Sequence, residues 1–416
     1  MNRMGGYTVV AAAVVLLVLL PQTHLAAAGR SDRRVPEIDV AELSFEQIVT
    51  VARGTTARIY MWGGSEAVNS WIDQYVIPEV GRRYGVTLER VPMDAAVFVN
   101  RLRAEKEAGR ETGSMDLLWI NGENFRNARQ EELLWGPFAS RLPNVSLVDP
   151  ALAEMDSGFP VEGYSVPWGR AQFNFDIDTA RIAAPPASFQ ELPEWVRRHP
   201  GRFTYPEPRD FTGSAFIRQA FIALSGGVAQ FLPGYDQQLL DRNAPVLWEY
   251  LNEIAPYLWQ QGESYPRDLA ALDALFQRGE VDVTMSFTQT NAATRTAQGR
   301  YPPTVRSFVM QDGSISNTHA LAIPWNGPNK AAALVVANFL ISPEAQLSKN
   351  DPANWGDFTV LALSRLPEQI RQQFTALDLG AATVPLEELE RHAVPEIPSE
   401  YWEELERRWE AEVRRR

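Results

Sequence analysis

The first half of the chain alternates between short apolar runs and segments with helical spacing. Residues 58–62 and 86–91 predict strands, because apolar, aromatic and β-branched side chains predominate there. Between them, residues 65–76 place apolar side chains at i, i+3, i+4, i+7 and i+8, which predicts a helix. Because proline lacks a backbone N–H, we expect Pro78 to end or kink this helix.

The same order continues and then restarts. Residues 94–109 predict a second helix and residues 116–120 a third strand, so the pattern indicates right-handed βαβ units and a parallel sheet. A long extended segment at residues 164–178 begins a second series, which predicts two α/β lobes. The later predicted elements are helices at 185–201 and 209–227, a strand at 203–208, a helix–turn–strand at 274–288 and a strand at 319–325.

A chain of 416 residues is too long for one ordinary core, which also favours two lobes. The final helix carries an apolar stripe of Trp402, Leu405, Trp409 and Val413, as expected of a helix docked on a lobe. The predicted organisation is a signal peptide (1–28), lobe 1 (29–166), lobe 2 (167–312), a return to lobe 1 (313–345) and a helical segment packing on the lobes (346–416).

The N-terminus has the pattern of a secretory signal. A basic start at Arg3 precedes twelve apolar residues from Val9 to Leu20, and small residues follow. Twelve residues are too few to span a bilayer, which takes about twenty. We expect cleavage after Ala28 and export to the periplasm.

Cysteine content and charge narrow the function. The chain has no cysteine, so it offers neither the lipid-bearing residue of a lipoprotein nor a cysteine nucleophile or zinc ligand. We therefore expect a soluble exported protein. The net charge of -13 argues against nucleic acid as a partner, because phosphates require basic surfaces.

Candidate ligand-binding residues follow the strands. In open α/β sheets, ligands bind beyond the carboxyl ends of the strands, and in two-lobed proteins they bind between the lobes. The segment "DLLWINGENF" (116–125) shows this most clearly, since an apolar strand ends in two amides and a carboxylate. The candidates are Trp62, Gly63, Gly64, Trp119, Asn121, Glu123, Asn124, Trp168, Tyr205, Asp210, Thr212, Gly213, Ser214 and Asn291.

The lobe 1 candidates favour a cationic ligand. Glu123 would pair with a positive group, Trp119 would stack on it, and Asn121 and Asn124 would orient it. The alternative is that Trp119 fills the core and the polar residues cap a helix, whose first turn favours an acid anyway. Gly63-Gly64 lets backbone N–H groups approach a ligand, or simply forms a tight turn.

The lobe 2 candidates favour an anion. Residues 210–214, "DFTGS", open a helix with hydroxyls and free N–H groups, although Asp210 itself would repel an anion and Thr212 or Asp210 could merely cap the helix. Tyr205 is a candidate second aromatic wall. Trp168 lies in the expected lobe-crossing segment, where it faces the ligand or packs the hinge.

These segments together resemble the extracellular solute-binding proteins of ABC importers, most closely the YnjB-like branch. The resemblance is carried by "MWGGSEAVNSWID", "DLLWINGENFR", "SVPWGRAQFNF", "TYPEPRDFTGSAF" and "VANFLISPEAQLSKNDPANWGD", in this order from Arg58 to Trp355. It implies a type II periplasmic-binding fold in which two lobes close on a solute and present it to membrane permease subunits driven by an ATPase.

The leading hypothesis is therefore a monomeric periplasmic solute-binding protein without cofactor or metal. A secreted hydrolase that uses cleft carboxylates is the enzymatic alternative, although the chain has no HExxH, GxSxG, GxGxxG or GxxxxGK[ST] motif. A sensor that presents its closed form to a membrane receptor is the third. A ligand with a cationic and an anionic end, such as a thiamine-like or aminophosphonate compound, would suit both groups of candidates.

Overall fold

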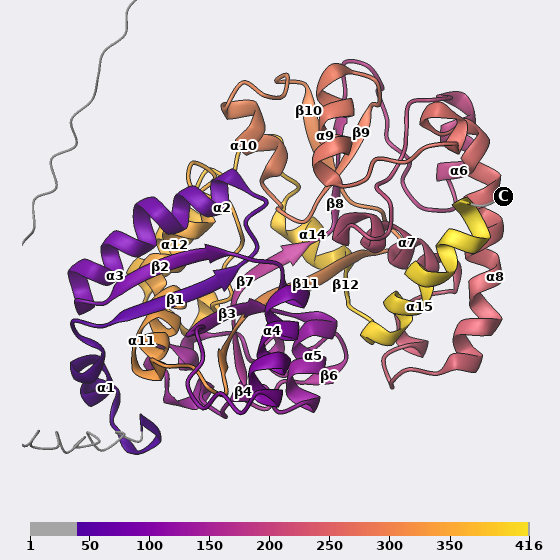
Figure 1. The fold of residues 1–416 in the computed structure, drawn as a ribbon. Coiled ribbons are helices and arrows are strands. Elements are labelled where there is room, and N and C mark those ends of the chain that lie inside the picture. Colours follow the sequence, from indigo (N-terminus) through magenta and orange to yellow (C-terminus); the bar gives the residue numbers. More distant parts are fainter. Residues whose placement is uncertain (1–39, 415–416) are drawn as a thin grey trace, which may run out of the picture. The chain divides into compact units, whose positions relative to one another are not determined.

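Three parallel strands form the centre of the first lobe (Figure 1). β1 (Thr56–Met61) lies between β2 (Thr87–Pro92) and β3 (Leu117–Ile120), and both pairings are parallel. The first three predicted strands are therefore confirmed. Because parallel strands point the same way, the residues that follow β1 and β3 lie at one edge of the sheet.

The structure, a computed structural model, describes residues 40–414 of the chain. The predicted signal peptide at residues 1–28, with its cleavage after Ala28, lies outside the described residues. Among the residues that are described, no single helix is long and apolar enough to cross a membrane.

The helix between β1 and β2 runs past Pro78 instead of ending there, so the expected end is wrong. α2 (Glu66–Trp71) continues through a π-helical stretch (Ile72–Val76) into α3 (Ile77–Tyr84). Pro78 stands in the first turn of α3, where a missing N–H and a fixed φ are tolerated. The π-helical turn before it thus allows one long helix to cover the sheet.

The rest of lobe 1 packs helices on this sheet. α11 (Lys330–Leu340) is the most enclosed of them, since every residue from Ala331 to Leu340 is buried. Burial of a Leu or Val side chain is worth roughly 2 kcal/mol, so this helix is a large part of the core. The other elements are α1 (Phe45–Ala52), α4 (Ala95–Glu107), α5 (Gly122–Gln130), α12 (Pro343–Asn350), α13 (Glu368–Thr375), β4 (Leu134–Trp135), β5 (Met155–Asp156) and β6 (Phe159–Pro160).

Two paired strands carry the chain between the lobes. β7 (Ser165–Gln172) belongs to the first sheet and leads through Phe173 into β8 (Asn174–Asp178) of the second. β11 (Ser314–Pro324) returns antiparallel to β7 and also pairs with β3. The lobes are therefore joined by hydrogen-bonded strands.

The second lobe contains a three-stranded antiparallel sheet in the order β10-β8-β9. The predicted strand at residues 203–208 is wrong, because this segment pairs with no strand of either sheet. Pro206 and Pro208 lack the N–H that a ladder needs, and the segment packs against helices instead. The elements are β9 (Val283–Ser286), β10 (Val305–Phe308), α6 (Leu192–Arg198), α7 (Phe211–Leu224), α8 (Gln237–Ile254), α9 (Leu269–Arg278) and α10 (Asn291–Ala297).

The C-terminal segment, residues 393–414, connects to both lobes. After α14 (Leu386–His392), β12 (Ala393–Pro395) pairs in parallel with β11. α15 (Ser399–Trp409) then packs on lobe 2, with its apolar stripe buried in that core. The predicted docking of this stripe on a lobe is confirmed.

Candidate functional site

The end of β1 is shaped by close packing. A Cβ atom on Gly63 would lie 2.9 Å from Cβ of Pro92, and one on Gly64 would lie 2.3 Å from the Trp62 ring. Gly63 therefore allows the chain to pass close to Pro92, and Gly64 allows Trp62 to fold back over the chain, while 48% of that tryptophan stays exposed. Ser65 then caps α2 by accepting a hydrogen bond from the N–H of Val68.

Trp119, the third residue of β3, belongs to an aromatic cluster. Its ring centroid lies 5.0 Å from Trp168, 4.7 Å from His319 and 5.9 Å from Trp355. Trp168 is fully buried behind it, whereas Trp119 keeps 9% of its surface exposed. This placement favours hinge packing for Trp168 and puts most of Trp119 in the core of lobe 1, with a small part of its surface open to solvent.

The turn after β3 presents its polar groups at the same edge of the sheet. Asn121 does not cap α5; its amide donates to the carbonyl of Thr318 on β11. Asp156 instead accepts a hydrogen bond from the N–H of Gly122. Asn124, like Asn121, is half-buried. The side chains of Asn121 and Asn124 therefore do not cap the start of α5.

Glu123 and Glu406 bring carboxylates from both lobes to this edge. Burial raises the pKa of Glu123 on α5, and the charge of Glu403 adds to the rise. Burial likewise raises the pKa of Glu406 on α15, against the hydrogen bond from Ser214 and the charge of Arg218, and the charges of Glu123 and Glu403 add smaller effects in the same direction as burial. Since one glutamate belongs to lobe 1 and the others to the helix docked on lobe 2, negative charge accumulates across the boundary.

One arginine spans the lobes beside these acids. Arg126 on α5 lies 2.7 Å from a carboxylate oxygen of Glu400 and 2.7 Å from one of Glu403, both on α15. Next to this contact, a Cβ on Gly122 would lie 3.0 Å from the Trp402 ring. The C-terminal segment therefore forms part of the boundary between the lobes as well as part of lobe 2.

The start of α7 is closed to an anion by its own side chains. Asp210 accepts hydrogen bonds from the N–H groups of Thr212 (2.9 Å) and Gly213 (3.2 Å). A Cβ on Gly213 would lie 2.3 Å from a backbone oxygen, so this glycine is required for packing. Ser214 is buried, accepts from Arg218 and donates to Glu406. Phe211, by contrast, is 44% exposed.

Two candidates have their hydrogen-bond partners within lobe 2. Tyr205 has no exposed surface, and its hydroxyl accepts a hydrogen bond from Trp409 within the core of lobe 2. Asn291 donates to Asp176 and accepts from Arg295. Both side chains have structural partners, so packing and network roles account for them.

Sequence reasoning missed His319 and the acids of α15. His319 is the first residue of the predicted strand at 319–325 and was not a candidate, yet in β11 it lies beside Trp119 and 3.5 Å from Asp357. Glu403 and Glu406 are far from β3 in the chain and meet it only through the docking of α15. The sole local signal was a polar residue at the start of the apolar run "HALAIPW".

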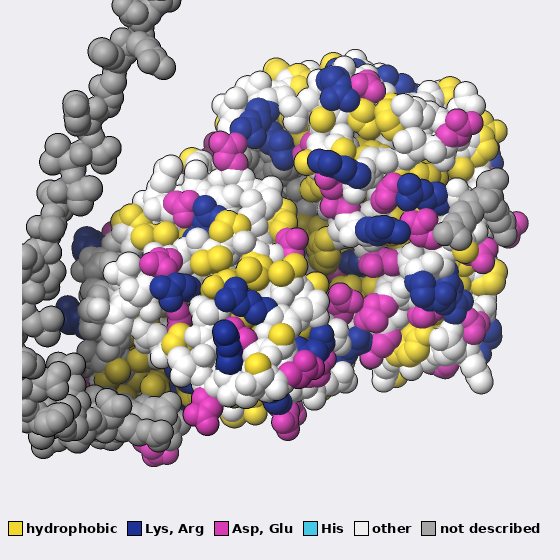
Figure 2. Space-filling view, viewed as in Figure 1, with side chains coloured by type: hydrophobic (Ala, Val, Ile, Leu, Met, Phe, Trp, Pro, Cys, Tyr) yellow, Lys and Arg dark blue, Asp and Glu magenta, His cyan; other side chains and the backbone are white. Residues whose placement is uncertain are grey.

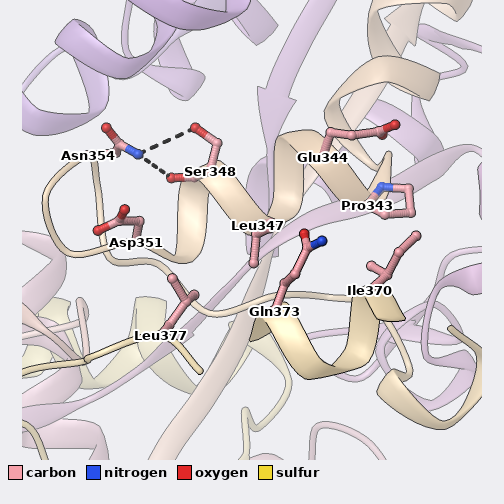
Figure 3. Close-up of a pocket in the computed structure, with 9 residues that line it drawn as sticks. All are labelled: Pro343, Glu344, Leu347, Ser348, Asp351, Asn354, Ile370, Gln373 and Leu377. Atoms are coloured by element: carbon pink, nitrogen blue, oxygen red, sulfur yellow. Dashed lines mark hydrogen bonds between the residues drawn. The ribbon is translucent and has the colours of Figure 1, made fainter. Parts of the chain in front are cut away.

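The surface is hollowed between the two lobes. Figure 2 shows a hollow between the two lobes, with hydrophobic side chains at its bottom and Asp and Glu side chains along its wall on lobe 2. A separate groove of about 350 Å³ lies on lobe 1 between α12 and α13 (Figure 3). Its nine lining residues include none of the candidates: Pro343, Glu344, Leu347, Ser348, Asp351, Asn354, Ile370, Gln373 and Leu377.

Two α/β lobes joined by paired crossing strands, with side chains from both lobes at one sheet edge, define the class of two-lobed binding proteins. A family model described as "Bacterial extracellular solute-binding protein" matches residues 77–360, and the chain belongs to this family. The chain is also 40% identical over 331 residues to Protein YnjB of Escherichia coli (strain K12), which covers 79% of this chain and 85% of the relative.

Solved structures with the same fold include binding proteins of several kinds. The spermidine/putrescine substrate-binding protein PotD of Streptococcus pneumoniae aligns with a TM-score of 0.63 at 14% identity, over 86% of this chain and 99% of that one. The periplasmic binding protein AfuA of Actinobacillus pleuropneumoniae, with fructose-6-phosphate bound, aligns with a TM-score of 0.59 at 16% identity, over 86% and 98%. The expected type II periplasmic-binding fold is confirmed.

The family settles the class of function. The chain is the solute-binding component of an ABC importer, as the sequence predicted. Proteins of this class bind small-molecule solutes and interact with permease subunits. The family also implies a periplasmic or extracellular location.

The buried acid that holds Asn291 makes stability depend on pH. Burial raises the pKa of Asp176 from 3.8 to about 6. A raised pKa means that the folded state binds the proton more tightly, so the contribution to stability is complete below pH 3.8 and is lost as the pH rises through about 6. Two pKa units correspond to roughly 3 kcal/mol.

We therefore expect Asp176→Asn to reduce the difference between the unfolding free energies at about pH 5 and about pH 7. Urea denaturation at each pH measures the two free energies. The exposed Asp378→Asn is the matched control and should keep the wild-type difference. If Asp176→Asn also keeps that difference, ionisation of Asp176 does not govern it.

Proposed function

We propose that the solute is a small molecule with a positively charged amine, bound between the two lobes where β1 and β3 end. The observation that carries this proposal is the group of carboxylates from both lobes, Glu123, Glu403 and Glu406. Burial and mutual repulsion raise the pKa of Glu123 and of Glu406. A cation between them would relieve both the repulsion and the cost of burying charge.

The start of α7 supports a cation over an anion. Its first free N–H groups donate hydrogen bonds to the Asp210 carboxylate, so a phosphate or carboxylate of the solute would have to displace that side chain. The hydroxyl of Ser214 is engaged by Arg218 and Glu406. The start of α7 therefore no longer supports the expectation that the ligand has an anionic end.

Aromatic side chains supply the remaining surface. Trp119 lies within β3, the exposed Trp62 follows the neighbouring strand β1, and the exposed Phe211 opens α7 on lobe 2. Faces of aromatic rings attract cations and pack on alkyl chains. We propose that Trp119 contacts the solute directly, with Asn121 and Asn124 orienting it, and that Trp62 and Phe211 become covered as the lobes close.

Related folds agree with an amine but do not require one. PotD is described as a spermidine/putrescine transporter protein, and a GABA receptor also shares the fold with a TM-score of 0.58 at 17% identity. All three molecules carry amines. The AfuA structure contains fructose-6-phosphate, so it represents binding of an anionic solute by the same fold.

We further propose that an N-terminal signal peptide directs the protein to the periplasm, where it acts as a monomer and delivers the solute to permease subunits. The apolar segment from Val9 to Leu20 and the lack of a cysteine for lipid attachment support this location. Closure of the lobes on the solute is the state that the permease would recognise.

Thermal unfolding with putrescine and with fructose 6-phosphate tests the solute class. A ligand that binds only the folded state raises Tm, so we expect putrescine to raise it and fructose 6-phosphate to leave it unchanged. Glu123→Gln and Glu406→Gln should each reduce the shift with putrescine, whereas Glu344→Gln, in the α12–α13 groove, is the matched control and should not. A shift with fructose 6-phosphate alone would contradict the proposal.

Titration calorimetry with putrescine tests the role of Trp119. Trp119→Ala should weaken binding by about 1 kcal/mol or more, because stacking and cation–π contacts contribute amounts of this size. Trp119→Phe keeps an aromatic face and should lose less. Trp259→Ala, at a half-buried tryptophan of lobe 2 that bonds Glu280, is the control. Unchanged affinity in folded Trp119→Ala would assign this residue to the core alone.

A further inference from the structure

His319 is placed at the strand-end edge by the pairing of β11. Ala320 pairs with Ile120, the last residue of β3, so His319 lies one step further, beside Asn121. On its other side it pairs with Gly169 of β7, and the register shifts between His319 and Ala320. Bulges of this kind re-aim a side chain and recur next to functional sites.

The imidazole ring is enclosed on most sides. Trp355 stacks on one face, with ring planes 17° apart and centroids 5.9 Å apart, and Trp119 lies 4.7 Å away on a tilted plane. A Cβ on Gly169 would lie 2.4 Å from Cδ2 of His319, so the ring needs a glycine at this position. Nε2 lies 3.5 Å from Oδ1 of Asp357.

Asp357 is itself fixed by a buried lysine. Nζ of Lys349 lies 2.5 Å from Oδ2 of Asp357 and donates to the carbonyl of Phe358, and the N–H of Arg170 donates to the same carboxylate. Burial acts to raise the pKa of Asp357, but the charge of Lys349 and the contact with His319 outweigh it, so the pKa lies below its ordinary value. Buried ion pairs add little stability, so this one is better explained by what it positions.

The remaining edge of the ring carries Nδ1. The His319 side chain is 15% exposed, whereas Asp357 behind it is 1% exposed. Because Nε2 and Cδ2 face Asp357 and Gly169, the open edge is the opposite one. In the part of the chain that the structure describes, no residue hydrogen-bonds Nδ1 of His319.

We infer that Asp357 positions His319 so that its Nδ1 is a hydrogen-bond acceptor for an N–H group of the solute. Lys349 and Asp357 already form a neutral pair, so a neutral imidazole with its proton on Nε2 leaves the buried cluster uncharged. Nδ1 then carries a lone pair toward the space between the lobes. The inference rests on the proposed function, since an ammonium group is the donor it would bind.

Nitrogen-15 NMR of histidine-labelled protein tests this directly, because the sequence contains only four histidines and a protonated ring nitrogen resonates far from an unprotonated one. In the free protein we expect the His319 proton on Nε2 near neutral pH, with the signal assigned by its loss in His319→Phe. Asp357→Asn should remove this tautomer preference while His199 and His392 stay unchanged. Adding putrescine should shift the Nδ1 signal of His319 and leave the signals of His199 and His392 in place.

His319→Phe retains the packing against Trp119 and Trp355 but lacks Nδ1, so it should weaken putrescine binding roughly tenfold or more. A free protein with the proton on Nδ1 of His319 overturns the inference whatever binds. Putrescine binding that leaves the His319 signals unmoved overturns it while the proposed function stands. If putrescine does not bind at all, the proposed solute class is wrong. The nitrogen-15 signals of the free protein, which show the tautomer of His319, then decide whether Nδ1 is an acceptor.

Discussion

Strand β11 is the element on which the arrangement of both lobes depends. It pairs with β3, β4, β7 and β12, so a single extended segment links the parallel strands of lobe 1, the outgoing crossing strand and the C-terminal segment. Backbone hydrogen bonds along it fix which residues of distant segments become neighbours. The contact of His319 with Trp119, and that of Thr318 with Asn121, both follow from this register.

The C-terminal segment adds a second link of a different kind. Its apolar stripe is buried in lobe 2, while Glu400 and Glu403 bind Arg126 of lobe 1 and Trp402 packs on Gly122. The side chain of Arg126 is 10% exposed in these ion pairs, whereas those of Glu400 and Glu403 are 39% and 45% exposed. Helix α15 therefore places charge at the boundary between the lobes of a protein whose function requires two conformations.

The sequence predicted those parts of the fold and site that depend on local pattern. The order of strands and helices placed Trp119 and Asn121 at a strand end, because parallel strands share a carboxyl edge. It failed where a partner is distant in the chain. Asp357 and Lys349 reach His319 only through tertiary packing, and Glu406 reaches Ser214 only because α15 docks on α7.

Two ligand-binding interpretations drawn from the sequence were changed by the structure, because a sequence pattern does not show which way a side chain points. The segment "DFTGS" has the composition of an anion site, but the carboxylate of Asp210 takes up the N–H groups itself. Tyr205 has the composition of a cleft wall, but it faces Trp409 inside lobe 2. Composition specified the chemistry available at each place, and packing decided whether a ligand could reach it.

The central claim is that the solute binds where β3 and β11 meet between the lobes. A crystal structure of the protein with putrescine tests it most directly. We expect electron density for putrescine against Trp119, with its amines beside His319 or the carboxylates of Glu123 and Glu406. Density in the groove between α12 and α13 instead, with the space between the lobes empty, would contradict it.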